Sequence, residues 1–141
     1  MNPHVYIWIH GAFMIGILII LLIFADREFS PGRDFAEFRD QIGVVSSSMQ
    51  FSKTEKGAYV SVVGLLTNRS QFEWKEVQLE ARYYDKDGKL IDTGIERNYE
   101  AVMLPNSEAA FRIRTVADKP ETAYANHKVF VRTAKDARRI F

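Results

Sequence analysis

An uncharged apolar run near the N-terminus sets the strongest limit on how this chain can fold. From Val5 to Phe24 the sequence holds 20 residues without a formal charge, whereas all 19 basic and 18 acidic residues follow Ala25. As a helix rising about 1.5 Å per residue, this run is roughly 30 Å long and matches the hydrocarbon core of a bilayer. We therefore expect residues 1–25 to form a single-pass transmembrane anchor that binds membrane lipid through residues 5–24.

A cleaved signal peptide is the alternative interpretation of the same run. Three features favour a retained anchor instead. The chain begins without a basic n-region, the apolar run exceeds the usual span of about 7–15 residues, and no small-x-small cleavage site precedes Asp26.

The side of the membrane on which the remaining residues lie is open from the residues alone. Arg27, Arg33 and Arg39 follow the run, and no Lys or Arg precedes it. The positive-inside rule then favours a cytoplasmic domain, although long domains can translocate despite flanking charge.

Within the apolar run, Ala12 and Gly16 form a small-xxx-small pair at which a second helix can approach closely. We consider them a possible helix–helix contact. His10 lies in the same run without a second ligand four residues on, so we expect neither haem nor metal binding there.

Residues 26–43 are predicted to be a juxtamembrane linker with a short amphipathic helix. Asp34 is placed as its N-cap and Gly43 as its end, and Phe35, Phe38 and Ile42 recur on one face. That face either packs on the following domain, dips into the headgroups, or binds a partner.

In residues 44–141 apolar residues recur at every second position, and turn signals follow one another about every 8–12 residues. The clearest strand covers 76–84, where apolar and polar residues alternate, and the Asp85–Gly88 turn after it predicts a hairpin. Further strands are predicted at 89–95 and around 99–103, and Gly64 predicts a bulge or a close backbone approach. We expect an all-β antiparallel sandwich of about seven strands.

The residues give no catalytic, cofactor or metal site. Cysteine is absent, which removes thiolate ligands and thiol nucleophiles. Asp85 and Asp87 resemble the opening of a calcium loop, but a hairpin turn explains them without a metal. His127 has no Ser or Cys partner that the sequence nominates. The near balance of charges gives no basic excess, so we expect no nucleic-acid partner. Because the residues give no visible catalytic site, we also do not expect an enzyme.

Two aromatic residues, Phe72 and Trp74, precede the strand at 76–84. Aromatic residues in that position seal the end of a core more often than they hold a ligand. Together with Phe35 and Phe38 they are the residues that we consider for an interaction.

Three segments resemble the FxLYD-type domain: GLLTNRS at 64–70, VQLEARYYDKDG at 77–88, and Leu104-Pro105 with Glu108 and Phe111. The signature itself reads Ala81-Arg82-Tyr83-Tyr84-Asp85, so its first Phe and its Leu are replaced. The resemblance implies an immunoglobulin-like sandwich on a bacterial or archaeal membrane anchor or lipoprotein, facing outside the cytoplasm. It implies no catalytic residues.

These observations lead to one expected function and one alternative. We expect a membrane-tethered, non-catalytic interaction or accessory domain of the cell envelope, with other envelope or membrane proteins as partners. The alternative is a module that binds a small ligand or glycan through the loops around Trp74.

Overall fold

The protein is represented by a computed structural model that describes residues 14–22 and 32–138, with the side chains of 98–100 excepted. Residues 14–22 form a helix whose large apolar side chains are exposed, from 38% at Ile17 to 65% at Met14. No helix within the described ranges has both the length and the apolar character needed to cross a bilayer. The expected span of residues 5–24 lies mostly outside these ranges, so the transmembrane helix stays a prediction.

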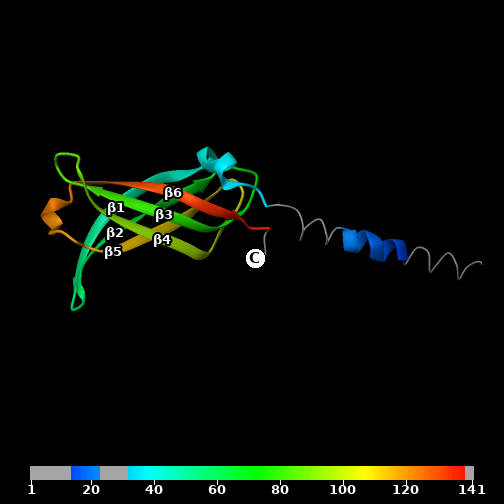
Figure 1. Cartoon of the computed structure of the whole chain (residues 1–141), viewed down its shortest axis with the longest axis horizontal. Helices are drawn as coiled ribbons and strands as arrows, with labels where there is room; N and C mark the ends of the chain where they lie inside the picture. Colours follow the sequence, from blue (N-terminus) through cyan, green and yellow to red (C-terminus); the bar gives the residue numbers. More distant parts are fainter. Residues whose placement is uncertain (1–13, 23–31, 139–141) are drawn as a thin grey trace, which may run out of the picture. The chain divides into compact units, whose positions relative to one another are not determined.

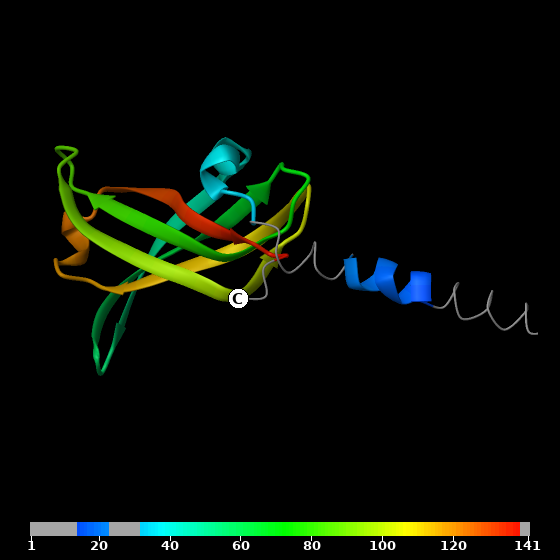
Figure 2. The same ribbon diagram turned by 45° about the vertical axis from the view of Figure 1, so that its right-hand side comes forward.

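Residues 33–137 form one compact unit built from two antiparallel three-stranded sheets. The first sheet has the order β1-β2-β5 and the second the order β4-β3-β6, as can be followed in Figure 1 and, after rotation, in Figure 2. The all-β sandwich predicted from the sequence is confirmed. In chain order the elements are η1 (Phe35–Gln41), β1 (Ile42–Thr54), β2 (Gly57–Asn68), β3 (Trp74–Tyr84), β4 (Leu90–Met103), β5 (Ser107–Val116), η2 (Glu121–Ala123) and β6 (Asn126–Asp136).

The strand β4 joins two segments that the sequence analysis separated. The predicted strands at 89–95 and 99–103 both pair with β3, from Ala81↔Gly94 through to Trp74↔Met103. The register shifts between Lys75 and Val77, and Glu76 between them has φ 49°. The polar residues 96–98 between the two segments pair in regular register with Leu79, Gln78 and Val77, and the irregularity follows them. They therefore continue one strand and do not form a turn, so 32–138 contains six labelled strands.

The core lies between the two sheets and follows the predicted alternation. In β3 the four apolar residues of the 76–84 pattern are at most 2% exposed, and the facing sheet contributes its own buried residues. Each buried Val, Leu, Ile or Phe side chain of this core stabilises the fold by about 1.5–3 kcal/mol relative to full exposure. The residues concerned are Val77, Leu79, Ala81 and Tyr83 from one sheet and Val60, Val62, Leu66, Phe111 and Ile113 from the other.

Two local predictions are confirmed by the backbone. A Cβ added at Gly64 would meet the carbonyl oxygen of Ser46 and, at 2.8 Å, the ring of Phe111, which is the close approach expected there. In the hairpin turn, the Oδ1 atom of Asp85 accepts hydrogen bonds at 2.9 Å from two backbone N–H groups, and Gly88 has φ 76°. Asp85 and Gly88 therefore shape the hairpin turn, as the sequence predicted.

Candidate functional site: the aromatic junction

The short helix η1 forms as the sequence predicted, with a tighter winding. Asp34 is its N-cap, with extended backbone angles and a side chain that accepts a hydrogen bond from the N–H of Ala36 at 2.9 Å. Seven residues of 3₁₀ helix follow, and β1 begins at Ile42. The predicted end at Gly43 was wrong, because that residue already pairs with Thr67 in the sheet.

The four aromatic residues singled out from the sequence lie together at one end of the sandwich, where η1 packs on the domain. Phe35 meets Trp74 edge to face, with ring centroids 5.6 Å apart. Phe38 lies 5.1 Å from the ring of Phe72 and 5.5 Å from that of Trp74. We call these four residues the aromatic junction. Each ring pair of this kind adds about 0.5–1.5 kcal/mol beyond area burial, so the junction fixes η1 against the sandwich.

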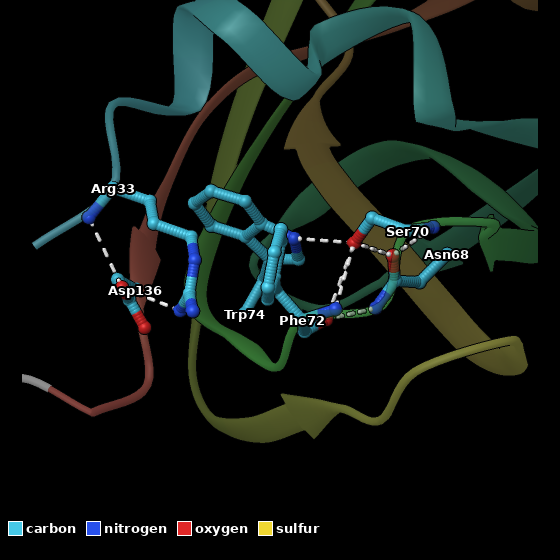
Figure 3. Close-up of polar contacts among 6 residues, drawn as sticks. All are labelled: Arg33, Asn68, Ser70, Phe72, Trp74 and Asp136. Carbon is cyan, nitrogen blue, oxygen red and sulfur yellow. Dashed lines mark hydrogen bonds and ion pairs between the residues drawn. The ribbon is translucent and has the colours of Figure 1, made fainter.

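Trp74 lies inside the junction, completely buried at 0% exposure. Its Nε1–H donates a hydrogen bond to the Oγ of Ser70 at 3.0 Å (Figure 3). The indole is therefore satisfied within the protein and does not offer a ring face to a ligand.

Asn68 organises the loops beneath the aromatic junction, and it too is 0% exposed. Its Nδ2 atom donates to the backbone oxygens of Phe72 at 2.7 Å, Leu104 at 2.9 Å and Met103 at 3.3 Å. Its Oδ1 accepts from the Oγ of Ser70 at 2.7 Å and from the N–H of Ser70 at 3.0 Å. One side chain therefore joins the loop before β3 to the loop after β4, on either side of the junction.

An ion pair between Arg33 and Asp136 lies beside the aromatic junction, at the first residues of the domain. The backbone N–H of Arg33 and its Nη1 both donate to Oδ2 of Asp136, at 3.0 and 3.1 Å (Figure 3). Asp136 is 2% exposed, and the Arg33 guanidinium lies 3.5 Å from the ring centroid of Phe72. The first residues of the compact unit are thereby fixed to the end of its last strand.

The polar part of this site was not predicted from the sequence. Asn68 and Ser70 entered only through the GLLTNRS resemblance, which gave neither residue a role. Arg33 and Asp136 are 103 positions apart, and no local signal pairs them.

Of the predicted helix–helix contact residues Ala12 and Gly16, Ala12 lies outside the described residues, as does His10. Gly16 lies in the helix at 14–22, and a Cβ added there would meet nothing within 4 Å.

A groove is lined by residues of the two sheets. It has a volume of about 900 Å³, and its lining includes Ser47, Gly64, Leu79, Glu96 and Phe111. Its volume lies in the range of about 300–1,000 Å³ that is typical of small-molecule sites.

His127 has a partner that the sequence did not nominate. Its Nε2 lies 2.9 Å from the Oγ of Ser47, and burial lowers the pKa of its imidazole, which favours the neutral ring. A catalytic triad would need a carboxylate at the other ring nitrogen, and among the described side chains none contacts it.

Comparisons with known proteins identify no family for this chain. No protein-family model matches it, and no curated protein does. One similar solved structure is a DUF1425 family member from Shewanella sp. pv-4, with 14% identity, a TM-score of 0.42, and coverage of 64% of this chain and 76% of that chain. Another is an X-ray structure of a Northeast Structural Genomics Consortium target, with 14% identity, a TM-score of 0.42, and coverage of 69% and 86%. The resemblance to FxLYD-type domains stays a prediction.

Proposed function

We propose that this protein is a membrane-tethered, non-catalytic interaction or accessory domain of the cell envelope. The observation that carries the proposal is the aromatic junction, because it lies directly after the apolar N-terminal stretch. A flexible tether would leave residues 33–41 free of the sandwich. Here three ring contacts and the Arg33–Asp136 ion pair hold this segment on the domain. Residues 33–41 are therefore part of the folded domain and not of the connection to the apolar run.

The helix at 14–22 supports the tether. Its apolar side chains from Met14 to Leu22 are 38–65% exposed, and a run of exposed Ile and Leu is costly in water. Embedding the longer apolar run, residues 5–24, in lipid would remove that cost.

The order of the strands supports an immunoglobulin-like sandwich of the FxLYD type. The orders β1-β2-β5 and β4-β3-β6 follow the A-B-E and C′-C-F arrangement of immunoglobulin-like domains. We therefore retain the extracytoplasmic side that the resemblance implies, with other envelope or membrane proteins as partners at the sheet edges and end loops.

A second function, binding of a small ligand or glycan, is favoured by one observation, the groove of about 900 Å³ between the sheets. The loops around Trp74 no longer support it, because that ring is buried.

The tether is tested by washing membranes that contain the intact protein with alkaline buffer. We expect the wild type to stay in the membrane pellet and a Leu18→Arg variant to be released in part, because a charge near the centre of an apolar span costs about 2.5–3.5 kcal/mol. Release of the wild type to the same extent as the variant would refute the tether. Digestion of spheroplasts then tests the side, since protection of the domain while an external marker is cut would contradict an extracytoplasmic position.

The accessory role is tested by affinity capture of the intact protein from mild detergent. Recovery of the protein alone, at native abundance, would count against it. Saturable binding of a defined small molecule, lost when the groove is filled by Ser47→Phe, would favour the second function.

A further inference from the structure

The outer face of the sheet β4-β3-β6 carries an organised set of cations. Because Leu79, Ala81 and Tyr83 point into the core, their neighbours on β3 point outward. Register then places Glu80 beside Phe130 and Arg82 beside Lys128 on β6. Arg132 lies on the same face, since its Nη1 contacts Glu80. We call Arg82, Lys128, Phe130 and Arg132 the basic face.

One buried carboxylate holds two of these cations in place. Glu80 is only 6% exposed, although it lies on the outer side of the sheet. Its Oε1 accepts from Arg82 Nε at 2.6 Å and its Oε2 pairs with Arg132 Nη1 at 3.0 Å, while the two guanidinium side chains remain 42% and 48% exposed. The hydrogen bond from Arg82, opposed by burial and aided by the charges of both arginines, lowers the pKa of Glu80. The two guanidinium groups are thus held in place and open to solvent. With Lys128 they carry three positive charges against the one negative charge of Glu80.

Apolar and aromatic groups lie between the cations. Phe130 is 39% exposed, and the Arg82 guanidinium lies 4.6 Å from its ring centroid. Ile95, the β4 neighbour of Glu80, is 54% exposed, and the Lys128 ammonium lies 5.9 Å from the ring of Tyr84. A surface with both exposed cations and exposed apolar side chains matches the chemistry of a lipid headgroup region.

We propose that the basic face lies on the anionic lipid headgroups of the bilayer to which the chain is tethered. This inference rests on the proposed tether, because only nine peptide steps separate Phe24 from Arg33. Such a connection reaches at most about 30 Å, so the domain stays within one domain length of the lipid. Guanidinium groups pair well with phosphate, and cations near an anionic leaflet add to its attraction.

The experiment uses the intact chain in lipid nanodiscs, either of neutral phosphatidylcholine or of a mixture rich in phosphatidylglycerol. The chain has no cysteine, so one introduced thiol carries a single environment-sensitive fluorophore. Thr93→Cys places it on the basic side, beside Arg82 in the register, and Gln50→Cys places it on the outer side of the opposite sheet as the matched control. We expect the Thr93 label to be protected from an aqueous quencher in anionic discs only, and the Gln50 label to stay accessible in both.

Two further measurements separate charge from folding. Lys128→Glu, which leaves both pairs of Glu80 intact, is expected to weaken the protection of the Thr93 label several-fold. Raised salt is expected to weaken the protection of the Thr93 label in the chain that keeps Lys128, and this test requires no further substitution. Equal accessibility of the two labels in anionic discs, or equal protection of the Thr93 label in neutral discs, would overturn the proposal. So would protection by soluble polyglutamate alone, which would assign the face to an acidic protein partner.

Failure of the tether is distinguished in the same samples. A chain that leaves the discs on alkaline washing refutes the tether itself. A chain that stays in the discs while its Thr93 label remains accessible refutes only the placement of the basic face on lipid.

Discussion

Replacing Asn68 by Ala should be among the most damaging single changes in the domain. The side chain is wholly buried and serves three backbone carbonyls and both donors of Ser70. Truncation leaves the carbonyls of Phe72 and Leu104, the two closest acceptors, without this donor. With about 1–3 kcal/mol for each buried group left unsatisfied, and some compensation by water at these partly buried atoms, we expect a loss of about 3–4 kcal/mol. Small domains have only about 5–15 kcal/mol of stability in total, so much of it would be lost.

The measurement is urea unfolding of the intact chain in mild detergent, followed by the near-ultraviolet circular dichroism of the aromatic residues. Asn126→Ala is the matched control, because that residue is exposed and should change stability by less than about 0.5 kcal/mol. Asn68→Asp keeps the acceptor but turns a charge toward carbonyl oxygens. It should cost a similar amount at neutral pH and less in acid, where the new carboxyl group can donate. A cost of Asn68→Ala no larger than that of the control would refute the reasoning.

Three further outcomes are expected. Gly64→Ala should destabilise the domain by about 1–3 kcal/mol in thermal unfolding, because its Cβ would strike a backbone oxygen of the neighbouring strand, whereas Gly43→Ala has open space and should be nearly neutral. Hydrogen bonding to Arg82 lowers the pKa of Glu80 from 4.5 in the folded protein. The ion pairs of Glu80 therefore stabilise the fold above pH 4.5, and this stabilisation is lost as the pH falls through the lower folded pKa. Glu80→Gln should make the melting temperature fall less steeply over that acid range. In a Trp8→Phe background, the fluorescence of Trp74 should be blue-shifted and protected from iodide; strong quenching would contradict its burial.

Local patterns in the sequence were enough to predict much of the fold. The alternation from Val77 to Tyr83 identified both a strand and its buried side, because side chains on a strand alternate between the faces of the sheet. The capping residue Asp34 and the spacing of Phe35 and Phe38 identified η1 and its packing face. Only the residues adjacent in the chain were needed for these predictions.

Features that depend on sheet order were beyond the sequence. The contact of Ser47 with His127 spans 80 positions, and it exists because the edge strands β1 and β6 approach each other. The two guanidinium groups on Glu80 likewise come from different strands, β3 and β6. The sequence alone indicates that the acidic and basic residues of 76–84 lie on the solvent-exposed side of a strand. Only the pairing with β6 turns Glu80 into a buried carboxylate.

Because Arg33 and Asp136 are joined by a 3.0 Å hydrogen bond, the polypeptide enters and leaves the β-domain at the same end. Any protein fused after the last strand would therefore crowd the N-terminal connection. The hairpin turn at Asp85–Gly88 is different, since it lies beyond the far end of β3, roughly 30 Å along the strand from Trp74. A circular permutant could therefore join residue 137 to residue 33 by a short linker and begin and end in that turn. It should keep every strand pairing, and anything fused to its new termini would be attached at the opposite end of the domain.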